Sequence, residues 1–146
     1  MASVLFIGVS GQDPNIDLPP GVSAQELDAA IHKGTEAMKT AGYSVNLLMP
    51  PIMDGIAALE KDLETNRYDL VLVSVSIIDS YECSRRRSLQ GSLLISGQLG
   101  IRIVPKHTPY FEGIVNIALK YNPGQRFAFN ASLDSMLEAA QRALPL

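Results

Sequence analysis

Two apolar runs, VLFIGV (residues 4–9) and YDLVLVSV (68–75), constrain the fold more than any other feature of the sequence. Both are continuous, and neither shows the apolar–polar alternation of a strand with one face in water. Such runs are typical of strands that are buried on both faces, as in a parallel sheet covered by helices. The chain is therefore expected to be an α/β protein.

Helix and strand signals alternate between and around these runs. Ser23 to Glu26 has the S-x-x-E form of a capping box, and apolar residues then recur at helical spacing up to Gly42. Residues 44–49 form a second expected strand, which a Pro-Pro pair ends, and Asp54 is placed to cap a second helix.

The second half of the chain continues the alternation. Thr108-Pro109 offers a capping oxygen and a proline for the first helical position, and Asn122-Pro-Gly124 ends that helix. RFAFN (126–130) is the last expected strand, and residues 133–144 are the last helix. Right-handed crossovers between parallel strands then predict one α/β domain over residues 1–146. We expect three layers (α/β/α) and a sheet of about four strands in the order 2-1-3-4, Rossmann-like or flavodoxin-like.

Composition narrows the classes of function. The 146 residues carry a net charge of -3, which gives no overall basic field for nucleic acid or an anionic membrane. The only cysteine, Cys83, excludes an internal disulfide and suits a reducing compartment. The N-terminus lacks the pattern of a signal peptide, and no apolar run approaches the ~20 residues of a membrane helix. We expect a cytoplasmic protein that binds neither nucleic acid nor membrane.

Sheets of this kind bind ligands beyond the carboxyl ends of their strands, where the strand order reverses. Here that point lies between the first and third strands. An arginine offers a planar fork for a carboxylate or phosphate, and an asparagine can orient a ligand by hydrogen bonds. We therefore expect a small polar or anionic ligand. The residues expected to bind it are Ser10, Gly11, Gln12, Asp13, Ser74, Arg102 and Asn130.

Sequence motifs for nucleotide binding and phosphotransfer are missing. Neither G-x-G-x-x-G nor a Walker A sequence occurs, so the identity of any cofactor stays unknown. Residues 54–75 resemble the second helix and third strand of a response-regulator receiver. Receivers carry an acidic pair after the first strand and a phospho-accepting aspartate near the end of the third. Val9-Ser10 and Ser74 stand at those places, so receiver-type phosphotransfer is not expected.

The two histidines offer little support for catalysis. His32 lies within the first expected helix and is interpreted as a bystander. His107 precedes a helix start and is the only obvious acid–base candidate, because histidine titrates near neutral pH. No cysteine or carboxylate stands at motif spacing, so no metal site is predicted and the question of catalysis stays open.

Five segments of the chain are LPPGVSAQEL (18–27), YDLVLVS (68–74), GIR (100–102), FEGIVN (111–116) and RFAFN (126–130). Together these segments resemble a family of small, uncharacterised bacterial and fungal α/β proteins. The resemblance implies a Rossmann-like fold and no particular reaction. In such relatives the third strand runs almost directly into G-[VI]-R, whereas here 24 residues, 75–98, intervene.

Residues 75–98 are therefore predicted to be an insertion, for which three interpretations stay open. The first is a retained intron: Val75-Ser76 can be encoded GTAAGT, Gln98 can be CAG, and Leu94-Ile95 can contain the branch-point-like CTGAT. Removing the segment would restore LVS-LGIR. In the second, the sequence RRRS (85–88) is a kinase site or binds a phosphate-bearing partner. In the third, the segment is a tolerated loop, since each doubling of loop length costs only ~0.6 kcal/mol.

Two functional hypotheses follow. The leading one is a small Rossmann-like protein that binds a small-molecule ligand. The alternative is a non-catalytic, receiver-like interaction or regulatory module that acts through a helix face or as a homodimer. A binding protein should gain thermal stability from one class of metabolite, whereas a module should show a concentration-dependent oligomer.

Overall fold

The computed structural model describes residues 1–15, 18, 23–74, 108–130 and 132–146. Its strands are β1 (Ser3–Ile7), β2 (Ser44–Leu48), β3 (Leu70–Ser74) and β4 (Arg126–Asn130). Its helices are α1 (Ala24–Thr40), α2 (Gly55–Thr65), α4 (Thr108–Tyr121) and α5 (Met136–Ala143). A short 3-10 turn, η2 (Leu133–Ser135), leads into α5.

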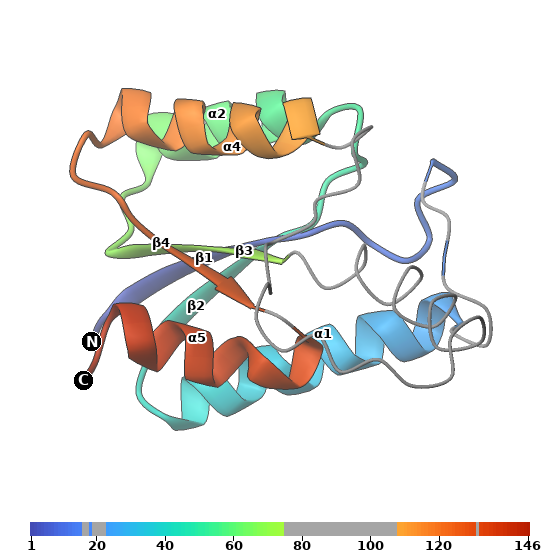
Figure 1. The fold of residues 1–146 in the computed structure, drawn as a ribbon, viewed down its shortest axis with the longest axis horizontal. Coiled ribbons are helices and arrows are strands. Elements are labelled where there is room, and N and C mark those ends of the chain that lie inside the picture. Colours follow the sequence, from blue (N-terminus) through green and yellow to red (C-terminus); the bar gives the residue numbers. More distant parts are fainter. Residues whose placement is uncertain (16–17, 19–22, 75–107, 131) are drawn as a thin grey trace, which may run out of the picture.

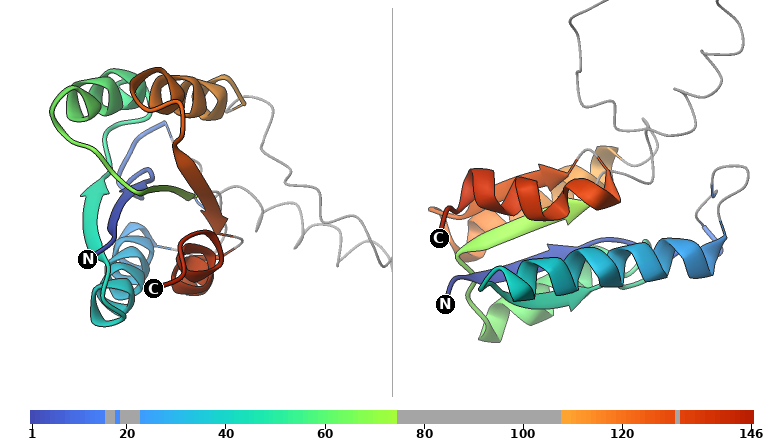
Figure 2. Two further views of the ribbon diagram at one scale, coloured as in Figure 1. Left: turned by 90° about the vertical axis from the view of Figure 1, so that its left-hand side faces the viewer. Right: turned by 90° about the horizontal axis from the view of Figure 1, so that it is seen from below.

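The strands form one parallel sheet in the order β2-β1-β3-β4. Helices α2 and α4 cover one face of the sheet, and α1 and α5 cover the other (Figure 1). The two further views show the same three layers (Figure 2). The predicted α/β/α architecture and strand order are confirmed.

The two central strands are buried on both faces, as their continuous apolar runs predict. Alternate residues of β1 and β3 point to opposite sides of the sheet. Against α1 and α5 lie Val4, Phe6, Leu70 and Leu72. Against α2 and α4 lie Leu5, Ile7, Val71 and Val73.

Helix α1 begins and ends at its sequence signals. The Ser23 Oγ accepts a hydrogen bond from the Glu26 amide at 3.2 Å, and the Glu26 carboxylate accepts one from the Ser23 amide at 2.9 Å. Gly42 follows the helix with a φ of 99°, a conformation that favours glycine. The predicted capping box and C-terminal glycine are both confirmed.

The elements differ from the expected ones in several details. Asp54 is the N-cap of α2, but its backbone is helical (φ −103°, ψ −4°) and its side chain makes no capping bond. The predicted side-chain cap is therefore wrong, because an N-cap normally needs an extended backbone. The first strand ends at Ile7 instead of Val9, and the last helix opens with the turn η2.

Within the described residues, no helix is both long and apolar enough to cross a membrane.

Candidate functional site

The carboxyl ends of β1, β3 and β4 lie next to one another. Ser74 and Asn130 are register partners at the ends of β3 and β4. Gly8 directly follows β1, and a Cβ placed on it would lie 3.5 Å from the Cβ of Ser74. The strand order reverses at this point, so the structure brings two predicted site residues, Ser74 and Asn130, to one location.

Gly8 belongs to this location although sequence reasoning did not single it out. A side chain there would point at the Phe6 ring, with its Cβ only 2.9 Å from the Phe6 Cε1. Glycine therefore allows the Phe6 ring to pack against the backbone at the end of β1. The available signal was a glycine near the end of a buried apolar run, which often marks a close approach of the backbone to a neighbour.

Asn130 is almost completely buried, with 1% of its surface exposed. Its Nδ2 donates a hydrogen bond to the backbone oxygen of Ser132 at 3.0 Å. The connection that follows β4 therefore fixes the orientation of the amide. A rigidly held amide at the end of a strand is suited to directional hydrogen bonding.

Asp13 links the loop after β1 to the connection between β2 and α2. Its buried carboxylate accepts hydrogen bonds from the Ile52 amide at 2.6 Å, the Asn15 amide at 2.8 Å and the Asn15 Nδ2 at 3.0 Å. Burial alone would raise the pKa of Asp13, but the hydrogen bonds from Asn15 and Ile52 together lower it. These contacts direct the carboxylate into the protein and give Asp13 a positioning role.

Asp28 of α1 holds the first part of the same loop, and sequence reasoning missed it. Its carboxylate accepts hydrogen bonds from the Gly11 amide at 3.2 Å, the Gln12 Nε2 at 3.3 Å and the Ser10 Oγ at 3.4 Å. A Cβ on Gly11 would lie 2.9 Å from the Cα of Ala24, so the loop runs close against the start of α1. No spacing motif links an acid inside a helix to a loop that precedes it.

Tyr110 stands in the first turn of α4, also at the carboxyl edge. Its side chain packs so closely on Gly55, the first residue of α2, that a Cβ on that glycine would overlap the phenol. The Tyr110 hydroxyl oxygen is buried and has no hydrogen-bond partner among the described residues. Burial, and then the negative charge of Asp13, raise the pKa of Tyr110 to about 12.

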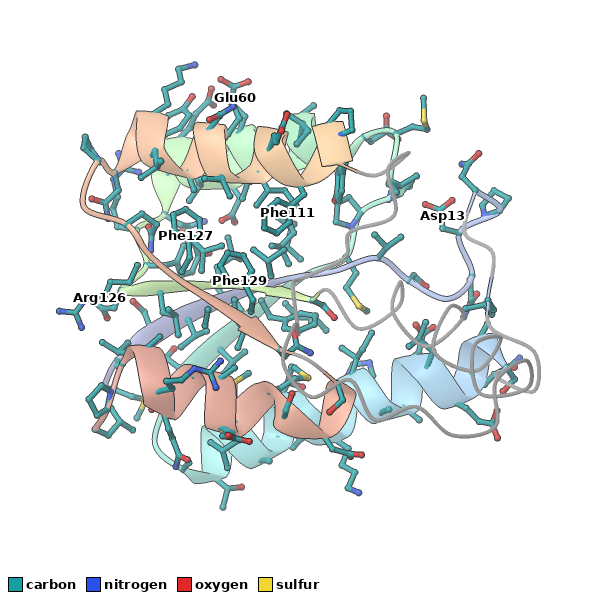
Figure 3. The ribbon with its side chains drawn as sticks, viewed as in Figure 1. Asp13, Glu60, Phe111, Arg126, Phe127 and Phe129 are labelled. Carbon is teal, nitrogen blue, oxygen red and sulfur yellow. The ribbon has the colours of Figure 1, made fainter. Side chains whose placement is uncertain are left out.

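Aromatic contacts fix the start of α4 against the sheet. The ring centroid of Phe111 lies 5.3 Å from that of Phe129 on β4, and Phe129 stacks on Phe127 at 6.4 Å. Figure 3 shows these rings between α4 and β4. Because Tyr110 is the neighbour of Phe111, these contacts also restrict where its side chain can lie.

The described part of the carboxyl edge is acidic. No lysine or arginine occurs in the described segments at this edge, which are residues 8–15, 23–28, 49–55, 108–111 and 132–136. Figure 3 shows Asp13 at one end of the molecule and Arg126 near the other. The acids of this edge are Asp13, Glu26, Asp28, Asp54 and Asp134.

The remaining predicted residues contribute less to this geometry. His32 is exposed on α1, as a bystander would be. Arg102, His107 and the whole insertion 75–98 lie outside the described residues. Within the part of the chain that is described, no group of three or more His, Cys, Asp or Glu residues could hold a metal ion.

Comparison of the chain with protein-family models, with curated proteins and with solved structures finds no match. The site therefore has to be argued from its own geometry.

Proposed function

We propose that this protein binds a small polar or anionic ligand at the carboxyl edge of its sheet, next to the ends of β1, β3 and β4. The observation that carries the proposal is the meeting of Gly8, Ser74 and Asn130 at the reversal of strand order. Open parallel sheets bind ligands at this position, because the connections leave the sheet toward opposite faces there.

The chemistry of these residues supports a role in binding more than one in catalysis. A hydroxyl and an amide on rigid strand ends can orient a ligand by hydrogen bonds. The resemblance to uncharacterised α/β proteins supplies no reaction, so we propose no catalytic step. The single cysteine supports a location in the cytoplasm.

Any anionic group of the ligand would depend on Arg102. The described carboxyl edge carries acids and no base, so it offers no cation of its own to a phosphate or carboxylate. Arg102 belongs to the connection between β3 and α4, which starts and ends at this edge. A guanidinium would supply the bidentate contact that such a group requires.

A thermal-shift screen tests the proposal. The purified protein is heated with a panel of carboxylates, phosphates and uncharged polar metabolites, each at a high concentration. One class should raise the unfolding midpoint, because a ligand at about 100 times its Kd stabilises the folded state by about 2.7 kcal/mol. Ser74→Ala should reduce that shift. Ser44→Ala, at the opposite edge of the sheet, is the matched control and should leave it unchanged.

Two results would contradict the proposal. If no member of the panel raises the midpoint and the protein instead associates with increasing concentration, the interaction module becomes the better hypothesis. If a ligand binds but Ser74→Ala and Arg102→Ala both leave its affinity unchanged, the site lies elsewhere.

A further inference from the structure

The Tyr110 hydroxyl is a buried polar group for which the described fold supplies no hydrogen-bond partner. Burying a hydroxyl without a partner costs stability, so native proteins rarely keep one. Most tyrosines whose hydroxyl is buried find a partner within the protein. The hydroxyl of Tyr110 lies beside Gly55, the first residue of α2, which is also at the carboxyl edge. Its missing partner is therefore explained if the ligand supplies one.

The surroundings of Tyr110 restrict its freedom to find another partner. The phenol packs directly on Gly55 at the start of α2, and the adjacent Phe111 is held on Phe129 at 5.3 Å between ring centroids. The nearby carboxylate of Asp13 accepts hydrogen bonds from Ile52 and Asn15. Tyr110 is thus held in place by packing while its hydroxyl stays without a partner in the described fold.

Electrostatics define what the hydroxyl can bind. With its pKa raised to about 12, the phenol keeps its proton at neutral pH and can donate a hydrogen bond. The acceptor must lie near the charge of Asp13, at an edge whose described residues include no lysine or arginine. An anionic acceptor would be repelled there, whereas a neutral carbonyl oxygen would not.

We propose that Tyr110 donates a hydrogen bond to an uncharged carbonyl or amide oxygen of the ligand. This inference rests on the proposed function and adds a residue and a ligand class to it. Any anionic group of the ligand then lies away from Tyr110 and Asp13.

The first part of the test compares two tyrosines without any added ligand. Tyr110→Phe keeps the ring on Gly55 and removes only the hydroxyl. Tyr43→Phe is the matched control, because the Tyr43 hydroxyl donates to the Leu144 backbone oxygen at 2.7 Å. Tyr110→Phe should unfold at the wild-type midpoint or above it, and Tyr43→Phe below it. A loss in Tyr110→Phe as large as that in Tyr43→Phe would overturn the proposal, since the hydroxyl would then have a partner within the fold.

The second part uses acid and amide pairs as probes: acetate with acetamide, glutamate with glutamine, and nicotinate with nicotinamide. An amide should stabilise the wild type more than its acid does. Tyr110→Phe should weaken the affinity for that amide about threefold to tenfold, as expected for one neutral hydrogen bond. Tyr43→Phe should leave that affinity unchanged.

The outcomes separate this inference from the function on which it rests. If a probe or a member of the wider panel binds the wild type and Tyr110→Phe equally well, Tyr110 is not a ligand contact and the binding function stands. If acids are preferred to amides, the uncharged acceptor is wrong and the binding function again stands. If nothing in either set stabilises the wild type, both proposals fail.

Discussion

The two edges of the sheet differ in how the chain turns at them. At the amino edge, helices return to strands through the short connections 41–43, 66–69 and 122–125. At the carboxyl edge, the connections include residues 8–23 after β1 and residues 75–107 after β3. Connections in α/β units usually have about 2–6 residues, so the amino edge is ordinary and the carboxyl edge is extended. Long connections at one edge are where binding residues are expected to gather.

The two edges also differ in how the hydroxyl of a tyrosine is hydrogen-bonded, as Tyr43 and Tyr110 show. Tyr43, at the amino edge, is 2% exposed and its hydroxyl donates to Leu144. Burial raises the pKa of both Tyr43 and Tyr110, yet of these two only the Tyr43 hydroxyl has a hydrogen-bond partner among the described residues. Burial therefore does not identify a binding residue. The more useful signal is a polar atom left without a partner at the edge where ligand binding is proposed.

The prediction that changes most of the chain concerns the connection after β3. Residues 75–98 lie outside the described residues, between Ser74 at the end of β3 and Thr108 at the start of α4. If they are a retained intron, sequencing the spliced messenger RNA across codons 70–105 should find Ser74 joined to Leu99. Residues 99–107 would then connect β3 to α4, close to the usual length.

The shortened chain gives this prediction a second readout. It should fold and be more stable by about 1 kcal/mol, because a connection of roughly a quarter of the length loses less entropy on closure. The intron hypothesis fails if codons 75–98 are present in every transcript. RRRS (85–88) would then be the first sequence to examine for phosphorylation, by mass spectrometry of the protein from its native cell.

Among single substitutions, Asp13→Ala should produce the largest effect on stability. Asp13→Ala would leave the Ile52 amide and the Asn15 side chain without their acceptor, and this should lower the free energy of unfolding by about 2–3 kcal/mol. Asp13→Asn is the matched control, since its amide oxygen can still accept one of these bonds and the loss should be smaller. Urea denaturation with an unchanged slope would measure both losses. Equal stability of Asp13→Ala and wild type would contradict the proposed link between the two loops.

The same residue predicts a pH dependence. The pKa of Asp13 lies below its ordinary value of 3.8, so the folded state favours the charged form. Its contribution is therefore complete above the unfolded-state pKa and is lost as the pH falls through the folded-state pKa. Between about pH 5 and pH 2, wild type should lose more stability than Asp13→Asn, which lacks this titration. Parallel curves for the two proteins in that range would count against the lowered pKa.

The fold could be predicted because it depends on local patterns. The runs around Val4 and Leu72 indicated buried parallel strands, and Ser23, Glu26 and Gly42 marked the ends of α1. Each of these signals acts within one element or one turn. The strand order then followed from general rules of connection and handedness. Asp54 was misjudged because the backbone at an N-cap decides whether its side chain can reach the helix.

The candidate site could be predicted only in part, because it depends on contacts between distant segments. Ser74 and Asn130 were found because each ends a strand, and parallel strands place their ends at one edge. Asp28 and Tyr110 were missed because their roles follow from neighbours in other elements. Asp28 contacts the loop after β1, and Tyr110 contacts the start of α2. No sequence motif predicts either contact.

The smallest predicted effect on stability is at the amino edge, where Ser3 and Asp69 form hydrogen bonds with each other. The Asp69 carboxylate accepts from the Ser3 amide at 2.8 Å and from its Oγ at 2.9 Å, and the Ser3 Oγ accepts from the Asp69 amide at 3.1 Å. Ser3→Ala removes the two side-chain bonds at an exposed position and keeps the backbone bond. The expected loss in the free energy of unfolding is about 0.5 kcal/mol.

This substitution should behave as the reverse of Tyr110→Phe. Ser3→Ala should lower stability slightly and leave the shift produced by any bound probe unchanged, whereas Tyr110→Phe should spare stability and weaken binding. Ser44→Ala, at the same edge, controls for the loss of a serine. Thermal unfolding of the three variants with and without the stabilising probe measures both quantities. A reduced probe shift in Ser3→Ala would show that the amino edge also takes part in binding, and the division of roles between the two edges would be wrong.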